Sequence, residues 1–212
     1  VSAVTATNMS GSGTTWTYSY TAPAGNGTDT FAFSVGTDAS GNVVTAAPTS
    51  GATVTVDNTA PVLAAVTQVV TPSNDVTPSY VFTTGEAGTI TTNITEGFST
   101  SNSAATGSNQ TITFNTLAAG TYADKTITVT DAAGNASSLT LTTFVIDTTV
   151  PTGAITYSSA SPYKQGATAT VTATFTESLT TTPKIAISGV STVAATNMSG
   201  SGTTWTYDYT AP

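Results

Sequence analysis

The sequence predicts an all-β protein built of antiparallel sandwiches, and three observations carry that prediction. Apolar residues alternate with threonine or serine along most of the chain, as in Trp16, Tyr18 and Tyr20. A period of two is typical of strands with one buried and one solvent-facing side. Glycine, asparagine, aspartate and proline separate the short runs, as turns between strands require. No stretch shows the 3.6-residue apolar period of an amphipathic helix.

The sequence at the beginning of the chain is repeated at its end. Residues 1–23 and 190–212 are identical at 20 of 23 positions, with an offset of 189 residues. A repeat of this length indicates a tandem array. We therefore expect the 212 residues to represent one 189-residue period of a longer polymer and a 23-residue overlap. The copies differ at three pairs of positions, which are Ala3/Thr192, Thr5/Ala194 and Ser19/Asp208.

Two linkers divide the chain, and each follows an apolar strand and ends in a proline, Pro61 or Pro151. Proline cannot continue a central strand. The linkers predict three segments: residues 1–57 as the C-terminal part of one unit, 58–147 as a complete domain, and 148–212 as the N-terminal part of the next unit. Residues 151–212 and 24–57 together amount to 96 residues, which is the size of an ordinary sandwich.

Each terminal part lacks its sheet partners within the chain. Either the chain is a window on a longer ordered polymer, or the ends of neighbouring molecules complete each other's sandwiches. The window is favoured because isolated half-sandwiches expose strand edges and an apolar face.

The alternation also predicts individual strands. In the complete domain we expect strands at 62–70, 78–84, 87–94, 108–115, 121–130 and 137–146. Segment 95–107 is expected to be a loop or a weak edge strand, and a phase slip at Thr142 and Thr143 suggests a bulge. In the flanking parts we expect strands at 14–20, 27–35, 42–56, 152–158, 167–176, 184–188 and 203–209.

Two aromatic rows of the same period occur in the two copies of the repeat. Alternation places each row on one face of a strand, which we expect to be the core face, a carbohydrate platform being the alternative. The rows are Trp16, Tyr18 and Tyr20, and Trp205, Tyr207 and Tyr209.

The composition excludes several classes of function. Only 7% of the residues are charged, and eleven acids face three lysines, giving a net charge of −8 without any histidine or cysteine. Nucleic acids and anionic membranes need a cationic surface. Disulfides, thiol catalysis and cysteine-based zinc sites need cysteine. No apolar run approaches the roughly 20 residues that span a bilayer, and no serine has a plausible base, so we expect neither membrane insertion nor enzymatic activity.

The chain resembles a known class of repeats. The segments TPSNDVTPSYVFTTGEAGTIT (71–91) and NQTITFNTLAAGTYADKTITVTDAAGNASSLTLTTFVIDTTVP (109–151) are similar to the bacterial Ig-like repeats of giant surface and adhesin-type proteins. The flanking parts resemble a second Ig-like repeat of such arrays, so the resemblance covers nearly the whole chain. It implies tandem Ig-like sandwiches on the cell surface, and 117–122 is similar to the tyrosine corner of Ig-type domains.

The acidic residues form a recurring pattern. In an Ig-like topology, the N-terminal linker, the loop between the second and third strands and the final hairpin loop share one pole. In the complete domain these segments carry Asp57, Glu86 and Asp131. Calcium takes six to eight oxygen ligands, so the triad predicts a Ca²⁺ site at the domain junction, with Asn58 or backbone carbonyls supplying further ligands.

The same pattern recurs in the second unit type. Asp147 is its linker acid and Glu177 its loop acid, and its hairpin acid is the counterpart of Asp38 in the next repeat. That second site is therefore expected to be incomplete unless another molecule supplies the loop. Taken singly, each acid also suits a turn, because Asp-x-x-Gly-Asn is a good hairpin sequence.

Three functions follow from these observations. The first is a structural stalk, spacer or fibre of an extracellular surface protein, stiffened by Ca²⁺ and in contact with neighbouring repeats of the same chain. The second is a binding module in which loops such as 95–107 recognise a surface glycan or another cell. The third is a self-assembling filament whose domains are completed between molecules.

Overall fold

The computed structural model describes residues 6–44 and 47–212, and the described part contains strands and no helix. The predicted all-β class is therefore confirmed. None of the described residues belongs to a helix long and apolar enough to cross a membrane. The chain divides into two compact units, Val1–Thr148 and Thr149–Pro212, which are described separately below.

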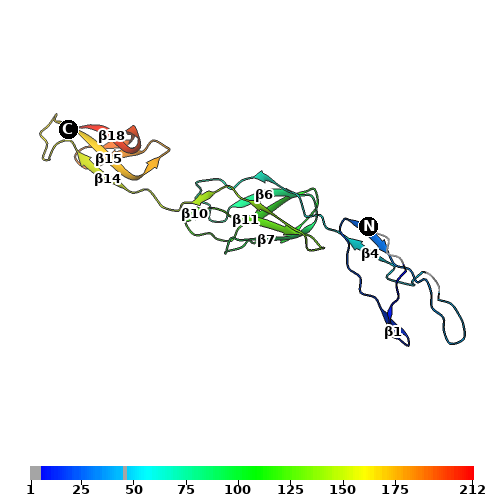
Figure 1. The fold of residues 1–212 in the computed structure, drawn as a ribbon. Helices are drawn as coiled ribbons and strands as arrows, with labels where there is room; N and C mark the ends of the chain where they lie inside the picture. The colour runs from blue at the N-terminus through cyan, green and yellow to red at the C-terminus, as the bar shows by residue number, and fades with distance from the viewer. Residues whose placement is uncertain (1–5, 45–46) are drawn as a thin grey trace. The chain divides into compact units, whose positions relative to one another are not determined.

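Residues 58–147 contain two antiparallel sheets and a further strand pair (Figure 1). One sheet has the order β5 (Leu63–Thr67), β6 (Ser79–Thr84) and β9 (Asn109–Thr113). The other has the order β12 (Ala136–Thr140), β11 (Thr126–Thr130), β7 (Gly88–Thr92) and β8 (Ser103–Ala104). The pair is formed by β10 (Gly120–Tyr122) and β13 (Phe144–Ile146).

One core joins these sheets. The alternating apolar residues of β6 and β11 point inward, so that Tyr80, Phe82 and Val129 are completely buried. Phe144 of β13 stacks on the Tyr122 ring at 5.0 Å between centroids, and it belongs to the same core cluster as residues of both sheets. Each such side chain contributes about 1.5–3 kcal/mol on burial, so the core holds the loops at its ends in fixed places.

Two predicted long strands are each divided in two. The predicted strand 121–130 is interrupted at Asp124, whose φ of 53° lies in the left-handed region. The predicted strand 137–146 is interrupted after Thr140, because β12 pairs with β11 whereas β13 pairs with β10. The phase slip at Thr142 and Thr143 is thus a change of strand partner, and the predicted bulge is wrong. Within 95–107, the short edge strand β8 pairs with β7.

Residues 6–57 form less regular structure than predicted. Strands β1 (Ser10–Ser12) and β2 (Thr15–Thr17) form a hairpin, and β3 (Gly27–Thr30) pairs with β4 (Thr53–Val56). The predicted strand 27–35 therefore ends early. Of the predicted strand 42–56 only the last part is a strand, and residues 45–46 lie outside the described residues, as do residues 1–5. Trp16 and Tyr18 are exposed, so their predicted core position is wrong for this copy.

The second unit contains a three-stranded antiparallel sheet. Strands β14 (Gly153–Tyr157), β15 (Thr168–Leu179) and β18 (Ser199–Thr210) form it in that order (Figure 1). A hairpin of β16 (Lys184–Ile187) and β17 (Val193–Asn197) accompanies it, and β17 was not predicted. Trp205 is buried in a cluster with Ala173 and Met198, and the half-buried Tyr207 packs against it. The predicted core face is therefore confirmed for Trp205.

Candidate metal centre

The linker after β4 is held by a network of side-chain hydrogen bonds. The Thr59 amide donates to Asp57 Oδ1 at 3.0 Å, which forms a local Asx turn. The Asn58 amide donates to Asn26 Oδ1 at 2.6 Å, and Asn58 Nδ2 donates to the Gly25 carbonyl at 2.5 Å. The amide nitrogen of the Asn58 side chain is therefore engaged with the segment before the linker.

The turn between β6 and β7 is fixed from inside. Thr84 is buried, and its Oγ1 donates to the Glu86 carbonyl at 2.7 Å and accepts from the Glu86 amide at 3.3 Å. The Gly85 amide donates to the Val62 carbonyl at 2.9 Å, which ties the turn to the chain just after the linker. At Gly88 a Cβ would lie 2.5 Å from the Thr130 carbonyl oxygen. Glycine at that position lets the turn approach the end of β11, where Asp131 follows.

The third acid lies in the hairpin between β11 and β12. Asp131 Oδ1 accepts from the amides of Ala133 and Asn135 at 2.8 and 2.9 Å. Asn135 Nδ2 donates to Asp131 Oδ2 at 2.9 Å and to the Asp57 carbonyl at 3.0 Å. These hydrogen bonds lower the pKa of Asp131, the Asn135 side chain having the largest effect. The carboxylate is thereby held ionised, and Asn135 joins the hairpin to the linker.

The three acids come together at one pole of the domain. One carboxylate oxygen each from Asp57, Glu86 and Asp131 lies within 4.8 Å of the others, and no second group of three acids of this kind occurs in residues 6–44 and 47–212. Glu86 Oε2 is enclosed and has no hydrogen-bond partner among the described residues. Burial raises the pKa of Glu86 first, and the charges of Asp57 and Asp131 raise it further. A shared cation would remove that repulsion.

No lysine of this domain neutralises the cluster. The only lysine between residues 58 and 147 is Lys125, whose Nζ lies 6.0 Å from the centre of the Tyr122 ring. Lys125 comes just before β11 and Asp131 comes just after β11. The strand between the two residues spans about 20 Å. Asp131 therefore lies beyond direct contact with Lys125, the one lysine of this domain.

The other Asp-x-x-Gly-Asn hairpin provides an internal comparison. Asp38 accepts from the amides of Ser40 and Asn42 at 2.8 Å, and Asn42 Nδ2 donates to Asp38 Oδ2 at 2.8 Å. These contacts match those of Asp131, and they also lower the pKa of Asp38. Asp38 nevertheless belongs to no acidic group in the described part of the chain. The turn alone therefore does not make a metal centre; the neighbouring Asp57 and Glu86 distinguish the Asp131 hairpin.

The remaining predicted site residues lie in different units. Asp147 follows β13 at the end of the first unit, and its amide donates to the Ser73 carbonyl at 2.8 Å. Glu177 lies inside β15, where the register with β18 is irregular, rather than in the predicted loop. The second calcium site, which would combine these two acids with a copy of Asp38, remains a prediction.

Two residues of the centre were not identified from the sequence. Asn135 links the hairpin to the linker carbonyl, and Thr84 fixes the conformation around Glu86. The recurrence of Asp-x-x-Gly-Asn at 38–42 and 131–135 was a sequence signal for Asn135. The inward position of Thr84 follows from the alternation of β6, in which Tyr80 and Phe82 are also buried.

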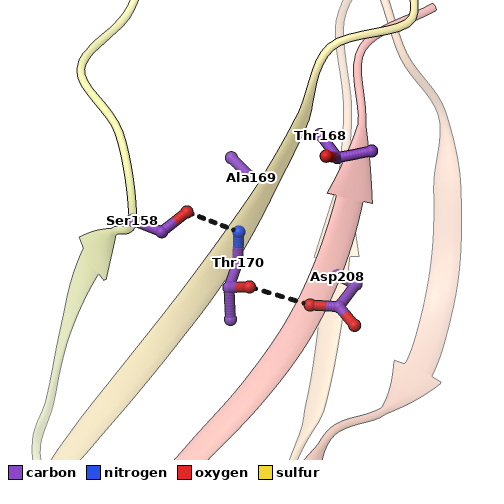
Figure 2. A pocket seen from close by; sticks show the side chains of 5 residues that line it. All are labelled: Ser158, Thr168, Ala169, Thr170 and Asp208. Carbon is purple, nitrogen blue, oxygen red and sulfur yellow. Dashed lines mark hydrogen bonds between the residues drawn. The ribbon is translucent and has the colours of Figure 1, made fainter.

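A shallow polar depression occurs on the second unit (Figure 2). The Thr170 amide donates to Ser158 Oγ at 2.9 Å, and Thr170 Oγ1 donates to Asp208 Oδ1 at 2.9 Å. Asp208 stands where the first copy of the repeat has Ser19. These groups bond to one another and hold adjacent strands together, so the depression offers a single carboxylate, which already accepts a hydrogen bond from Thr170.

Comparison with known proteins does not assign this chain to a family. No family model matches the chain, and neither a curated protein nor a solved structure matches it.

Proposed function

We propose that this chain is a structural segment of an extracellular surface protein, built from Ig-like sandwiches in tandem and stiffened by Ca²⁺ at a domain junction. The observation that carries the proposal is the meeting of Asp57, Glu86 and Asp131 within 4.8 Å. They come from a linker, a strand turn and a hairpin, which are separated by up to 74 residues in sequence. A cation held there links three parts of the fold.

Calcium fits the chemistry of these ligands. All three side chains offer carboxylate oxygens, the hard ligands that Ca²⁺ prefers, and the remaining positions are open to carbonyl groups and water. The enclosed Glu86 Oε2 has no hydrogen-bond partner among the described residues. Since a buried carboxylate without a partner is costly, a metal ion would convert this position from unfavourable to favourable.

The position of Asp57 gives the metal a mechanical role. It lies between β4 and β5, and the neighbouring Asn58 is bonded to Asn26 and Gly25 of the preceding segment. Binding of Asp57 to a cation shared with Glu86 and Asp131 would restrict rotation of the linker. A stiff junction of this kind suits a spacer, and the low charge and neutral hydroxyl-rich surface of the chain are consistent with a passive role.

The Ig-like assignment has its own support. Tyr122 OH donates to the Ala118 carbonyl at 3.0 Å, which is the type of hydrogen bond that a tyrosine corner makes. The strand that carries this tyrosine, β10, pairs with β13.

The proposal is tested by calorimetric unfolding of the whole 212-residue chain with Ca²⁺ and with a chelator. A site that binds the native state adds about 2.7 kcal/mol at a hundredfold excess of Ca²⁺ over its dissociation constant, so the midpoint of the first unit should rise. Small-angle scattering of the same samples should show a narrower distribution of chain dimensions with Ca²⁺.

The matched variants are Glu86→Gln and Glu96→Gln. The first removes a ligand of the centre, whereas the second changes a glutamate that is not part of the acidic group. We expect Glu86→Gln to abolish the Ca²⁺ response and Glu96→Gln to retain it. If Ca²⁺ leaves the unfolding midpoint of the native chain unchanged, the three acids serve only to stabilise turns, and calcium is not part of the function.

A further inference from the structure

The segment before β3 is tied to the linker by one asparagine side chain. Asn26 Oδ1 accepts a hydrogen bond from the Asn58 amide at 2.6 Å, and Asn26 Nδ2 donates to Thr59 Oγ1. Asn58 Nδ2 donates in return to the Gly25 carbonyl at 2.5 Å. These bonds reach the two residues that follow Asp57 in the sequence. Both polar atoms of the Asn26 side chain are therefore engaged with the linker.

Asn26 is also followed by a glycine, and it is the one asparagine of the chain for which this is so. In such a pair the next backbone nitrogen attacks the side-chain amide carbon readily, because glycine has no Cβ to hinder the approach of the two groups. The nucleophile here is the Gly27 nitrogen and the electrophile is Asn26 Cγ. The reactive pair thus coincides with the side chain that holds the linker.

The folded structure directs the two reacting groups toward other partners. Gly27 is the first residue of β3 and pairs with Val56 of β4. The Phe31 amide donates to the Ala52 carbonyl at 2.7 Å, and bonded pairs recur every two residues in an antiparallel ladder. The Gly27 amide is therefore directed toward Val56, while the Asn26 side chain is directed toward the linker. The attack requires both groups to leave these partners.

The end of the ladder is the place where such an opening occurs. Gly27 and Val56 form the terminal pair of β3 and β4, and the ends of strands open locally at a lower free energy than a whole unit. Asn26 lies just outside the ladder and is exposed to water. The rate of attack is then set by how often the linker releases the Asn26 side chain.

We propose that Asn26 is a site of spontaneous deamidation that the linker controls. The Gly27 nitrogen forms a bond to Asn26 Cγ, the Cγ–Nδ2 bond breaks, and Nδ2 leaves as ammonia with the proton of the Gly27 amide. Water then opens the resulting cyclic imide at either carbonyl, which gives aspartate or isoaspartate, and water is the one co-reactant. The site is protected while Asn58 and Thr59 hold the side chain. This proposal goes beyond the spacer function and does not depend on calcium.

The two products act differently on the linker. Aspartate keeps one oxygen to accept from the Asn58 amide, and its other oxygen accepts from the Thr59 hydroxyl, so the contact survives with an added negative charge. Isoaspartate lengthens the backbone by one carbon and shortens the side chain by one carbon. The pairing of Gly27 with Val56 then shifts, and the carboxylate no longer reaches Asn58. Formation of isoaspartate therefore releases the linker permanently.

The first test follows the reaction at Asn26 by peptide mapping and mass spectrometry of the whole 212-residue chain, kept in a chelator at neutral pH. We expect the native chain to react at least about tenfold more slowly than the same chain unfolded in urea. Thr59→Val removes the hydroxyl that holds Nδ2, and the native-state rate should rise about fivefold. Thr59→Ser keeps the hydroxyl and should restore the slow rate.

The matched control for Thr59→Val is Thr111→Val. Thr111 is an exposed threonine within β9, outside the linker and the segment that the linker holds. The same change of side chain at Thr111 should leave the rate at Asn26 unaltered. Unfolding midpoints of these variants are measured in parallel, so that release of the linker is separated from loss of the whole fold.

The second test reads the linker through hydrogen exchange of the Asn58 amide, which donates to Asn26 Oδ1. Exchange should stay slow in Asn26→Asp, because the acceptor oxygen is retained. It should be about tenfold faster in native chain that has been aged, and then separated by ion exchange, to carry isoaspartate at position 26. A change of charge alone would affect both samples equally, whereas release of the linker affects the aged chain alone.

Three outcomes would overturn the proposal. The first is a native chain that deamidates at Asn26 as fast as the chain in urea. The second is an equal rate in Thr59→Val and Thr59→Ser, and the third is an Asn58 amide that exchanges at the native rate in the chain with isoaspartate. All these measurements are made in a chelator, so a failure of the metal site leaves them unchanged and the two proposals are tested separately.

Discussion

Asn135 Nδ2 donates a hydrogen bond of 3.0 Å to the Asp57 carbonyl, across 78 positions of sequence. The same amide group donates to Asp131 Oδ2 at 2.9 Å. The final hairpin of the domain is thereby attached to the linker that precedes its first strand. This single side chain bonds to two of the three acidic residues of the candidate metal centre.

Replacing Asn135 should therefore weaken the centre through its geometry. In Asn135→Ala the hairpin loses two side-chain hydrogen bonds, and we expect the first unit to lose about 1–2 kcal/mol of stability. We also expect weaker Ca²⁺ binding by isothermal titration calorimetry, by roughly tenfold. Asn42→Ala is the matched control, because Asn42 makes the corresponding bond to Asp38, which belongs to no acidic group among the described residues. Equal Ca²⁺ affinities for the two variants would contradict a positioning role for Asn135.

Removing the Glu86 charge should have opposite effects without and with calcium. In a chelator, Glu86→Gln relieves the repulsion that Asp57 and Asp131 exert on a partly buried carboxylate, so the unfolding midpoint should rise. With Ca²⁺ the same variant lacks a ligand, so its midpoint should fall below that of the native chain. Differential scanning calorimetry under both conditions checks this crossing. A variant that is less stable in both conditions would show that Glu86 stabilises the fold by another contact.

The pH dependence of stability without metal follows from two opposite shifts. The pKa of Glu86 is raised above its ordinary value of 4.5, so its protonation favours the folded state, and that stability is lost as pH rises through the raised pKa. The pKa of Asp131 is lowered below 3.8, so its contribution is present above 3.8 and is lost as pH falls through the lowered pKa. In chelator, stability should therefore increase on acidification from neutral pH and decrease at the most acidic values.

Calcium should reverse the upper part of this profile, because it binds the ionised form of Glu86. With Ca²⁺, acidification from neutral pH should lower the unfolding midpoint. In Glu86→Gln the midpoint should depend less on pH near neutrality, both with Ca²⁺ and with a chelator. Thermal unfolding between about pH 3 and pH 8 measures both limbs. A native chain whose midpoint falls steadily on acidification in chelator would contradict the proposed repulsion at Glu86.

The two tryptophans should report different environments. In Trp205→Phe the remaining Trp16 is exposed, and we expect emission at long wavelength that acrylamide quenches readily. In Trp16→Phe the remaining Trp205 is buried in the second unit, and we expect emission at shorter wavelength with weaker quenching. Equal quenching of the two variants would contradict the different burial of the two copies.

Several features of the candidate centre could be predicted from sequence because they depend on recurring local patterns. Asp57, Glu86 and Asp131 were selected by their places in a linker, a turn and a hairpin, and the structure brings these three together. The bond from Asn135 to the Asp57 carbonyl could not be predicted, since it depends on how two loops face each other. The change of strand partner after Thr140 was also missed, because a phase slip looks the same in a bulge and in a crossing.

The sequence by itself determined the local conformations, and the two copies of the repeat show how far that extends. Trp16 Nε1 donates to the Gly13 carbonyl at 3.2 Å and Trp205 Nε1 donates to the Gly202 carbonyl at 3.1 Å. Such bonds join residues three positions apart, so identical sequence gives identical geometry. Tertiary structure alone decided that one tryptophan is buried and the other exposed. Burial needs distant partners, and β15 together with Met198 supplies them to Trp205, whereas among the described residues the hairpin around Trp16 consists of β1 and β2 alone.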